Sequence, residues 1–151
     1  MNLTQQSMIG RGEWRTARGN WNFTDDAGGT SATSPFTVFS VTGDVYAQAF
    51  GLCQVTVASV GGAATIELGI GGNTAALIAQ TAADDLDQYE TWQDAGPEAN
   101  PGAVPLDARG FVIANGADVI MTIGAANLTA GDVDFVARWF PISDDGDVTA
   151  T

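Results

Sequence analysis

The chain has 151 residues with no histidine and no lysine, and its 18 acidic residues outnumber five arginines to give a formal net charge of −13. The missing side chains exclude a Ser-His-Asp or Cys-His arrangement, a Schiff base and a P-loop, which leaves carboxylates as the acid–base groups. The negative charge disfavours binding to nucleic acid and to anionic membrane surfaces, because both would repel it.

Composition predicts one folded domain that needs no cofactor. Hydrophobic residues make up 45% of the chain, and a chain of this size can bury about 70% of its unfolded surface. The N-terminus lacks the pattern of a secretory signal, and no run approaches the ~20 apolar residues that cross a bilayer. The single Cys53 excludes an intramolecular disulfide, and its apolar surroundings predict a buried thiol.

Residues 1–34 are predicted to form an extended N-terminal arm. They are rich in Gly, Asn, Thr and Ser, show no sustained hydrophobic period and end in the loop-like run at 25–35. Three arginines balance three acids in this segment, so the entire net charge of −13 falls on the remaining residues. The sequence therefore predicts a neutral arm before an acidic body.

Aromatic and cationic side chains gather in the arm. Trp and Arg are the residue types most enriched at protein–protein hot spots, so we predict that the arm docks onto a larger assembly. Deletion of residues 1–24 should then leave a folded body. In the alternative interpretation, the arm is the first strand of the body and its rings fill the core. The candidate interface residues are Arg11, Trp14, Arg15, Arg18, Trp21 and Phe23.

After Pro35, short β-branched and aromatic runs alternate with turns rich in Gly, Asn and Asp, which is typical of an all-β domain. Segment 94–109 holds three of the five prolines and predicts a long loop. About eight strands favour a two-sheet antiparallel sandwich of jelly-roll type over 35–142. An acidic C-terminal tail is expected at 143–151. The predicted strands span 36–42, 44–58, 64–70, 75–80, 88–93, 110–115, 118–125 and 132–142.

Acidic clusters in the body leave two further hypotheses open. Two Asp-rich runs, 84–87 and 144–147, offer oxygen ligands for Ca²⁺, but neither matches an EF-hand loop, so a solvated acidic surface is favoured. A glycosidase needs two carboxylates across a cleft. Candidates exist at Glu67, Glu90 and Asp94, but among 18 acids some pair is inevitable. We therefore assign no catalytic residue and no metal site.

Aromatic residues of the body suggest a sugar-stacking platform built on Trp92 or Trp139. Aromatic residues on strands more often pack in the core or against a sheet face, and that interpretation is favoured. Arg138 lies between Ala137 and Trp139 on an apolar strand. We expect its side chain to point outward and to meet a neighbouring carboxylate.

Four segments of the body resemble small β-sandwich virion-associated proteins of tailed bacteriophages, a group of capsid decoration and auxiliary structural proteins. They are FTVFSVTGDV at 36–45, ATIELGIGGNTAALIAQTAADDLD at 64–87, YETWQDAGPEA at 89–99 and DVIMTIGAANLTAGDVDFVARWFPISDDG at 118–146. The resemblance includes none of residues 1–34 and carries over no site residues. It implies a structural subunit of the particle that acts by assembly.

We therefore predict a capsid decoration or cement protein on the outer surface of a phage head, assembled in the host cytoplasm. Its partners would be the major capsid protein and sister subunits, in a homo-oligomer for which a trimer is favoured. A tail, fibre or baseplate component and a host-glycan-binding module are the alternatives.

Overall fold

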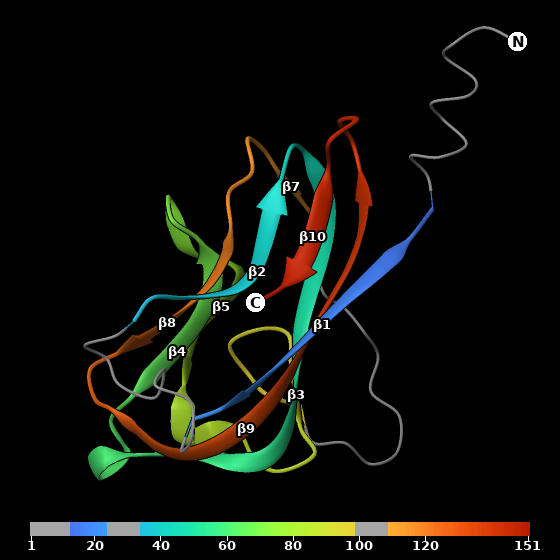
Figure 1. Cartoon of the computed structure of the whole chain (residues 1–151). Helices are drawn as coiled ribbons and strands as arrows, with labels where there is room; N and C mark the ends of the chain where they lie inside the picture. Colours follow the sequence, from blue (N-terminus) through green and yellow to red (C-terminus); the bar gives the residue numbers. More distant parts are fainter. Residues whose placement is uncertain (1–12, 24–33, 99–108) are drawn as a thin grey trace, which may run out of the picture.

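The computed structural model describes residues 13–23, 34–98 and 109–151, and nearly all of its regular structure is β (Figure 1). Within these ranges, ten strands form two antiparallel sheets, and two short 3₁₀ helices lie at Val60–Gly62 and Ala83–Asp85. The strands are β1 (Arg15–Asn22), β2 (Phe36–Thr42), β3 (Val45–Ser59), β4 (Thr65–Ile70), β5 (Asn73–Ala82), β6 (Thr91–Trp92), β7 (Phe111–Ile113), β8 (Val119–Gly124), β9 (Leu128–Pro141) and β10 (Asp147–Ala150).

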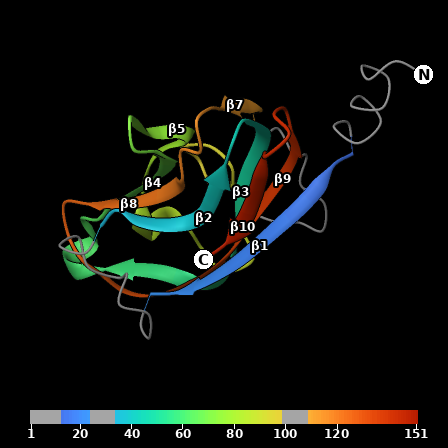
Figure 2. The ribbon, with the colours of Figure 1, turned by 45° about the horizontal axis from the view of Figure 1, so that its top comes forward.

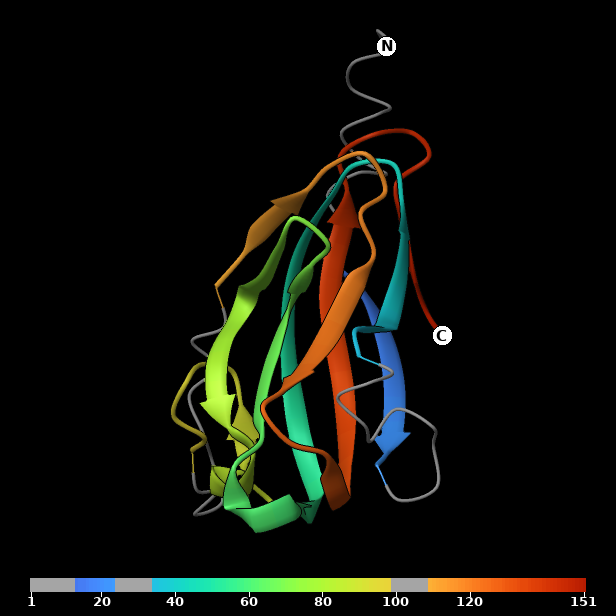
Figure 3. The same ribbon diagram turned by 90° about the vertical axis from the view of Figure 1, so that its left-hand side faces the viewer.

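The two sheets stack in the order of a jelly roll. Sheet A runs β1-β9-β3-β6, with β7 also paired to β3, and sheet B runs β10-β2-β8-β4-β5. Most connections cross from one sheet to the other, which is how a jelly roll winds eight strands into two layers. The short strands β6 and β7 share one position beside β3, and β10 is added at the edge of sheet B (Figure 3). The predicted two-sheet all-β sandwich is confirmed.

The core lies between the sheets and is organised around one large aromatic side chain. Trp92 is 0% exposed, and its ring meets Phe135 edge-on at a centroid distance of 6.3 Å. Its Nε1–H donates a hydrogen bond of 2.8 Å to Oγ1 of Thr81. Because Trp92 belongs to sheet A and Thr81 to sheet B, this pair joins the two layers. A Cβ at Gly51 would lie 3.0 Å from Val133 Cγ1, closer than ordinary contact, and 3.4 Å from Trp92 Cε3.

Part of the predicted arm belongs to the sandwich. Strand β1 pairs with β9 along its whole length, from Arg15 opposite Trp139 to Asn22 opposite Asp132. Gly19 has no Cβ, and one placed there would lie 3.6 Å from Ala150 Cβ, so β1 passes close to β10 at one margin of the molecule (Figure 2). The boundary predicted at residue 34 is therefore wrong for residues 15–22. Residues 1–12 and 24–33 of the predicted arm lie outside the described residues.

The predicted acidic tail also contains a strand. Residues 147–150 form β10, which pairs with β2 through four residue pairs from Asp147 opposite Thr42 to Ala150 opposite Phe39. Val148 points inward and is buried. In this short edge strand side chains alternate between core and solvent, so the residues before and after Val148 face solvent. One inward apolar residue is therefore sufficient to anchor the strand. The prediction of a tail over 143–151 is wrong for this segment.

The strands predicted within the body are present with shifted ends. β2 has the predicted bounds, whereas the predicted strand at 88–93 shrinks to the two residues of β6. The reason is local, because Tyr89 adopts a positive φ of 69°, which breaks an extended strand. Residues 99–108 of the predicted loop at 94–109 lie outside the described residues. Ala83–Asp85, which lies between two predicted strands, makes one turn of 3₁₀ helix.

Candidate docking face

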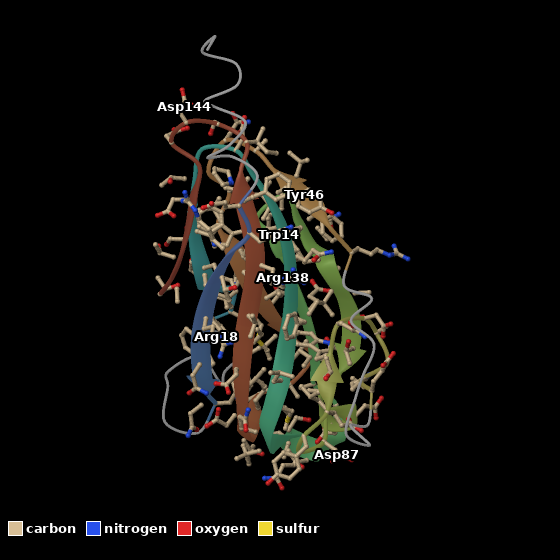
Figure 4. All side chains as sticks on the ribbon, turned by 90° about the vertical axis from the view of Figure 1, so that its right-hand side faces the viewer. Trp14, Arg18, Tyr46, Asp87, Arg138 and Asp144 are labelled. Atoms are coloured by element: carbon tan, nitrogen blue, oxygen red, sulfur yellow. The ribbon has the colours of Figure 1, made fainter. Side chains whose placement is uncertain are left out.

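The outward surface of sheet A brings together side chains from three strands that are distant in the sequence. Side chains alternate inward and outward along β1, β9 and β3, and the strand register aligns their outward positions in rows. We call this surface the outer face of sheet A. Figure 4 views the molecule from this side. Its members are Thr16, Arg18 and Asn20 of β1, Asp132, Asp134, Val136, Arg138 and Phe140 of β9, and Tyr46, Gln48, Phe50 and Leu52 of β3.

An aromatic cluster occupies one end of this face. The Trp14 ring stands edge-on to Tyr46 and to Phe140, at centroid distances of 5.8 Å and 5.2 Å, and the Tyr46 and Phe140 rings stack at 4.9 Å. The Arg138 guanidinium lies over Trp14, with Cζ 4.8 Å from the ring centroid (Figure 4). Trp14 remains 46% exposed. We call these four residues the aromatic cluster, and their mutual contacts hold an accessible tryptophan in a fixed orientation.

The middle of the face is apolar and slightly hollowed. Val136 lies between Arg18 of β1 and Phe50 of β3 in one row of the sheet. A hollow of about 330 Å³ opens here, and Leu52 and Asp134 also line it. Val136 is 6% exposed although it points outward, because its larger neighbours cover it. The hollow therefore combines apolar walls with one cation and one anion at its rim.

The other end of the face is acidic. Asp132 and Asp134 both accept hydrogen bonds from the side-chain amide of Asn20, and Asp134 Oδ2 accepts another of 2.8 Å from Gln54 Nε2. These amides fix the two carboxylates while leaving them further capacity to accept hydrogen bonds. Along β9 the face thus changes from anionic at Asp132 to cationic at Arg138.

The structure separates the predicted interface residues into two groups. Trp14 and Arg18 are exposed on the outer face of sheet A, in keeping with a docking role. Trp21 is half-buried and packs on Phe36 at a centroid distance of 4.1 Å. Phe23 is 3% exposed, and its backbone N–H donates to the Gly131 carbonyl. The Phe23 ring therefore packs within the sandwich, as the alternative interpretation expected, and is not available for docking. Trp21 packs on Phe36 but stays partly exposed, so its docking role remains a prediction.

The two remaining predicted arginines have different outcomes. Arg15 lies in the same row as Trp139, and its Cζ is 5.1 Å from the centroid of that ring. Its guanidinium therefore covers a tryptophan that belongs to the core. Arg11 lies outside the described residues.

Sequence reasoning missed the partners of Trp14. Tyr46 and Phe140 become its neighbours only through the register of β1, β9 and β3, which a single sequence does not specify. Arg138 points outward as predicted, but it contacts the Trp14 ring instead of the expected carboxylate. One signal was available in the sequence: large apolar residues alternate with small ones along β3, so both faces of that strand carry apolar side chains.

The other hypotheses lose support from the geometry. Trp92 and Trp139 are 0% and 2% exposed, so neither ring can stack on a sugar from solution. Asp84 accepts hydrogen bonds from the backbone and hydroxyl of Ser59, and Asp145 accepts one from Ser143, so these acids cap turns. Within 13–23, 34–98 and 109–151, no group of three or more Asp, Glu, Cys or His is placed to hold a metal ion.

The three carboxylates considered for glycosidase chemistry lie on separate elements. Glu67 belongs to β4, where it pairs opposite Thr122 of β8. Glu90 accepts a hydrogen bond from the backbone N–H of Asp87, and Asp94 accepts one from Gly96. The latter two carboxylates thus stabilise turns on either side of β6.

Cys53 is the buried thiol that the sequence predicted. It is 1% exposed, and its Sγ lies 3.1 Å from the Val55 carbonyl oxygen. Burial is the main cause that raises the pKa of this thiol from 9.0 to about 11; the carboxylates of Glu90 and Asp87 contribute to the rise, and backbone hydrogen bonds oppose it. The thiol is consequently protonated and unreactive at neutral pH.

We expect Cys53 in the folded protein to react with iodoacetamide at pH 8 about 100-fold more slowly than in the denatured chain, since two pKa units remove that fraction of thiolate. Mass spectrometry of timed samples measures both rates. The unfolded thiol releases its proton near pH 9.0 and the folded one near 11. The thiol's contribution to stability is therefore complete below pH 9 and is lost as the pH rises through this window. Cys53→Ala should remove that part of the alkaline destabilisation, and equal pH profiles would contradict the assignment.

The comparisons with known proteins complete the description of this face. No helix in the described part of the chain is long and apolar enough to cross a bilayer. Searches against protein-family models, curated proteins and solved structures found no match to the chain. The resemblance of the body to phage decoration proteins therefore remains a prediction. The geometry of the outer face of sheet A is the basis for the function proposed below.

Proposed function

We propose that this protein is a structural virion protein of a tailed phage, a capsid decoration protein that binds the outer surface of the head through its aromatic cluster. The observation that carries the proposal is the position of Trp14, which is 46% exposed yet held by two aromatic rings and a guanidinium. Rigid tryptophans with an adjacent arginine dominate the energies of protein interfaces, because they lose little conformational entropy on binding.

Charge distribution supports the same orientation on a particle. Asp87 lies near the far end of the long axis of the molecule from Trp14, whereas Asp144 lies near the same end as Trp14 (Figure 4). Three of the four arginines among the described residues, namely Arg15, Arg18 and Arg138, belong to sheet A. An aromatic and cationic end suits an acidic or neutral partner surface, and the acidic remainder would face solvent and keep particles apart by repulsion.

Copy number in purified particles tests this role. We expect quantitative mass spectrometry of virions from the phage that encodes the chain to find hundreds of copies per particle, as a head-decorating protein requires. A dozen copies or fewer would place the protein in the tail, fibre or baseplate instead. Absence from the particles would contradict a structural virion role altogether.

A substitution tests the docking residue itself. Trp14→Ala should weaken binding of the full-length protein to undecorated heads by about 30-fold or more, which corresponds to a hot-spot loss of about 2 kcal/mol. Val60→Ala is the matched control, because Val60 is an exposed apolar residue on the turn after β3. Circular dichroism should show both variants folded. Unchanged binding of Trp14→Ala would show that the aromatic cluster is not the contact, whatever the copy number.

A further inference from the structure

We propose that two copies of this chain pair face to face through the outer face of sheet A, so that the cationic half of one copy covers the anionic half of the other. The inference rests on the proposed role as an assembly protein and names the partner of this face, a second copy.

The local charge balance of this face allows two copies to approach each other. Its strands carry outward Arg18 and Arg138 against outward Asp132 and Asp134, which sum to zero. The whole chain, in contrast, carries −13. Charges beyond about 8 Å are largely screened at physiological salt, so the balance at the face decides whether two copies repel. The outer face of sheet A is therefore a neutral surface on a strongly acidic protein.

The outward side of β3 carries large apolar side chains. In β3 the inward positions carry small residues such as Ala47 and Ala49, while the outward positions include Phe50 and Leu52. An antiparallel sheet with one wet face normally directs its apolar residues inward and its polar residues outward. Apolar residues on both faces of β3 indicate that both faces are covered. At one end of the outer face Trp14 packs on Tyr46, and the outward Phe50 and Leu52 line the hollow in its middle.

The outer face of sheet A is complementary to a second copy of itself. We place a two-fold axis between the two facing sheets, perpendicular to the strands and level with Phe135. This axis reverses the strand direction and places position 138 of one copy over position 132 of the other. Gly51 and Gly19 both pair with Phe135 and share its row of the sheet. Arg138 then meets Asp132 of the second copy, and Phe50 meets Leu52. Each contact occurs twice, which is the signature of an isologous interface.

The same axis brings Arg18 over Asn20 of the second copy, beside the Asp134 that Asn20 holds. All four charges of the face thus gain an opposite partner in one arrangement. The inference differs from the trimer favoured by the sequence, because face-to-face pairing about a two-fold axis gives a dimer.

Sedimentation equilibrium of the purified full-length protein tests the pairing. The expected mass is twice 15.5 kDa, about 31 kDa. Arg138→Asp and Asp132→Arg should each weaken the dimer by about 100-fold or more, since each substitution places like charges together twice. Arg109→Asp is the matched control: Arg109 is exposed and lies outside sheet A's outer face, so its dimer should be unchanged.

Mixing the two weakened variants gives the decisive result. In a heterodimer of Arg138→Asp with Asp132→Arg, one contact is reversed in sign and the other is native, so the mixture should dimerise although neither variant does so alone. The double variant should also dimerise, which keeps the test valid if one single variant folds poorly. A monomeric wild type, a trimer insensitive to both substitutions, or a mixture that stays monomeric would each overturn the inference.

The outcome is independent of the virion role. If the purified protein is a dimer but virions do not contain it, the pairing is supported and the proposed function is contradicted. If the wild-type protein is a monomer that decorates heads, the proposed function is supported and the pairing is contradicted.

Discussion

Replacing Trp92 by alanine is expected to lower the free energy of unfolding by about 3–5 kcal/mol, the range for deleting a large aromatic ring from a core. Natural domains are stable by only about 5–15 kcal/mol, so this loss approaches the whole margin. The physical reason is that Trp92 is fully buried, contacts Phe135 and donates a hydrogen bond to Thr81 on the opposite sheet. Urea titration followed by tryptophan fluorescence and circular dichroism measures the change.

Two variants separate the parts of this effect. Thr81→Val keeps the side-chain shape but leaves the buried Nε1–H of Trp92 without its acceptor, which should cost about 1–3 kcal/mol. Tyr89→Ala removes an aromatic ring that is 64% exposed and should change stability by less than about 0.5 kcal/mol. If Trp92→Ala costs no more than Tyr89→Ala, Trp92 does not join the two sheets.

Deletion of residues 1–23 is expected to prevent cooperative folding, whereas deletion of residues 1–12 should preserve it. The longer deletion removes β1 with its eight residue pairs to β9, and with it the buried ring of Phe23. Loss of one such ring alone costs about 3–5 kcal/mol, and the exposed edge of β9 would add a site for aggregation. Far-UV circular dichroism and thermal melting of the two truncated proteins measure the outcome.

This expectation reverses the one from sequence, where a body without residues 1–24 should still fold. The shorter deletion leaves every described strand in place and is the matched control. A cooperative melt of the protein lacking 1–23, close to that of the full chain, would show that β1 is dispensable and would restore the interpretation of this segment as an arm.

The fold of the body could be predicted because its strands carry strong local signals. β4 alternates Ile66, Leu68 and Ile70 with polar or small residues, and β8 places Val119, Met121 and Ile123 on one face. Turns with Gly and Asn adjoin both strands. β1 has no such signal, since two of its inward positions are Ala17 and Gly19. A Cβ at Gly19 would be in ordinary contact with Ala150 of β10, 3.6 Å away. The inward side of β1 thus carries small residues and lacks the hydrophobic pattern by which a strand is recognised.

The candidate site was only partly predictable for a different reason. Composition identified Trp14 and Arg18 as unusual for an acidic chain, and both lie on the outer face of sheet A. Trp21 and Phe23 have the same composition signal, but the alternation of β1 and its close approach to the core decide that Phe23 packs inside and that Trp21 packs on Phe36. Which aromatic residues stay outside depends on strand register, and register is set by pairing with β9 more than 100 residues away.

The pairing of β1 with β9 also has a consequence for how the chain reaches its fold. Asn20 and Asp132, which are bonded through their side chains, are separated by 112 positions in the sequence. During synthesis sheet A cannot close until nearly the whole chain has been made, and until then β3 lacks its main neighbour. Sheets built from such distant contacts fold slowly, in milliseconds to seconds, with strand edges exposed meanwhile. The net charge of −13 then has a further use, because it keeps newly made, half-folded copies apart until the last strands arrive.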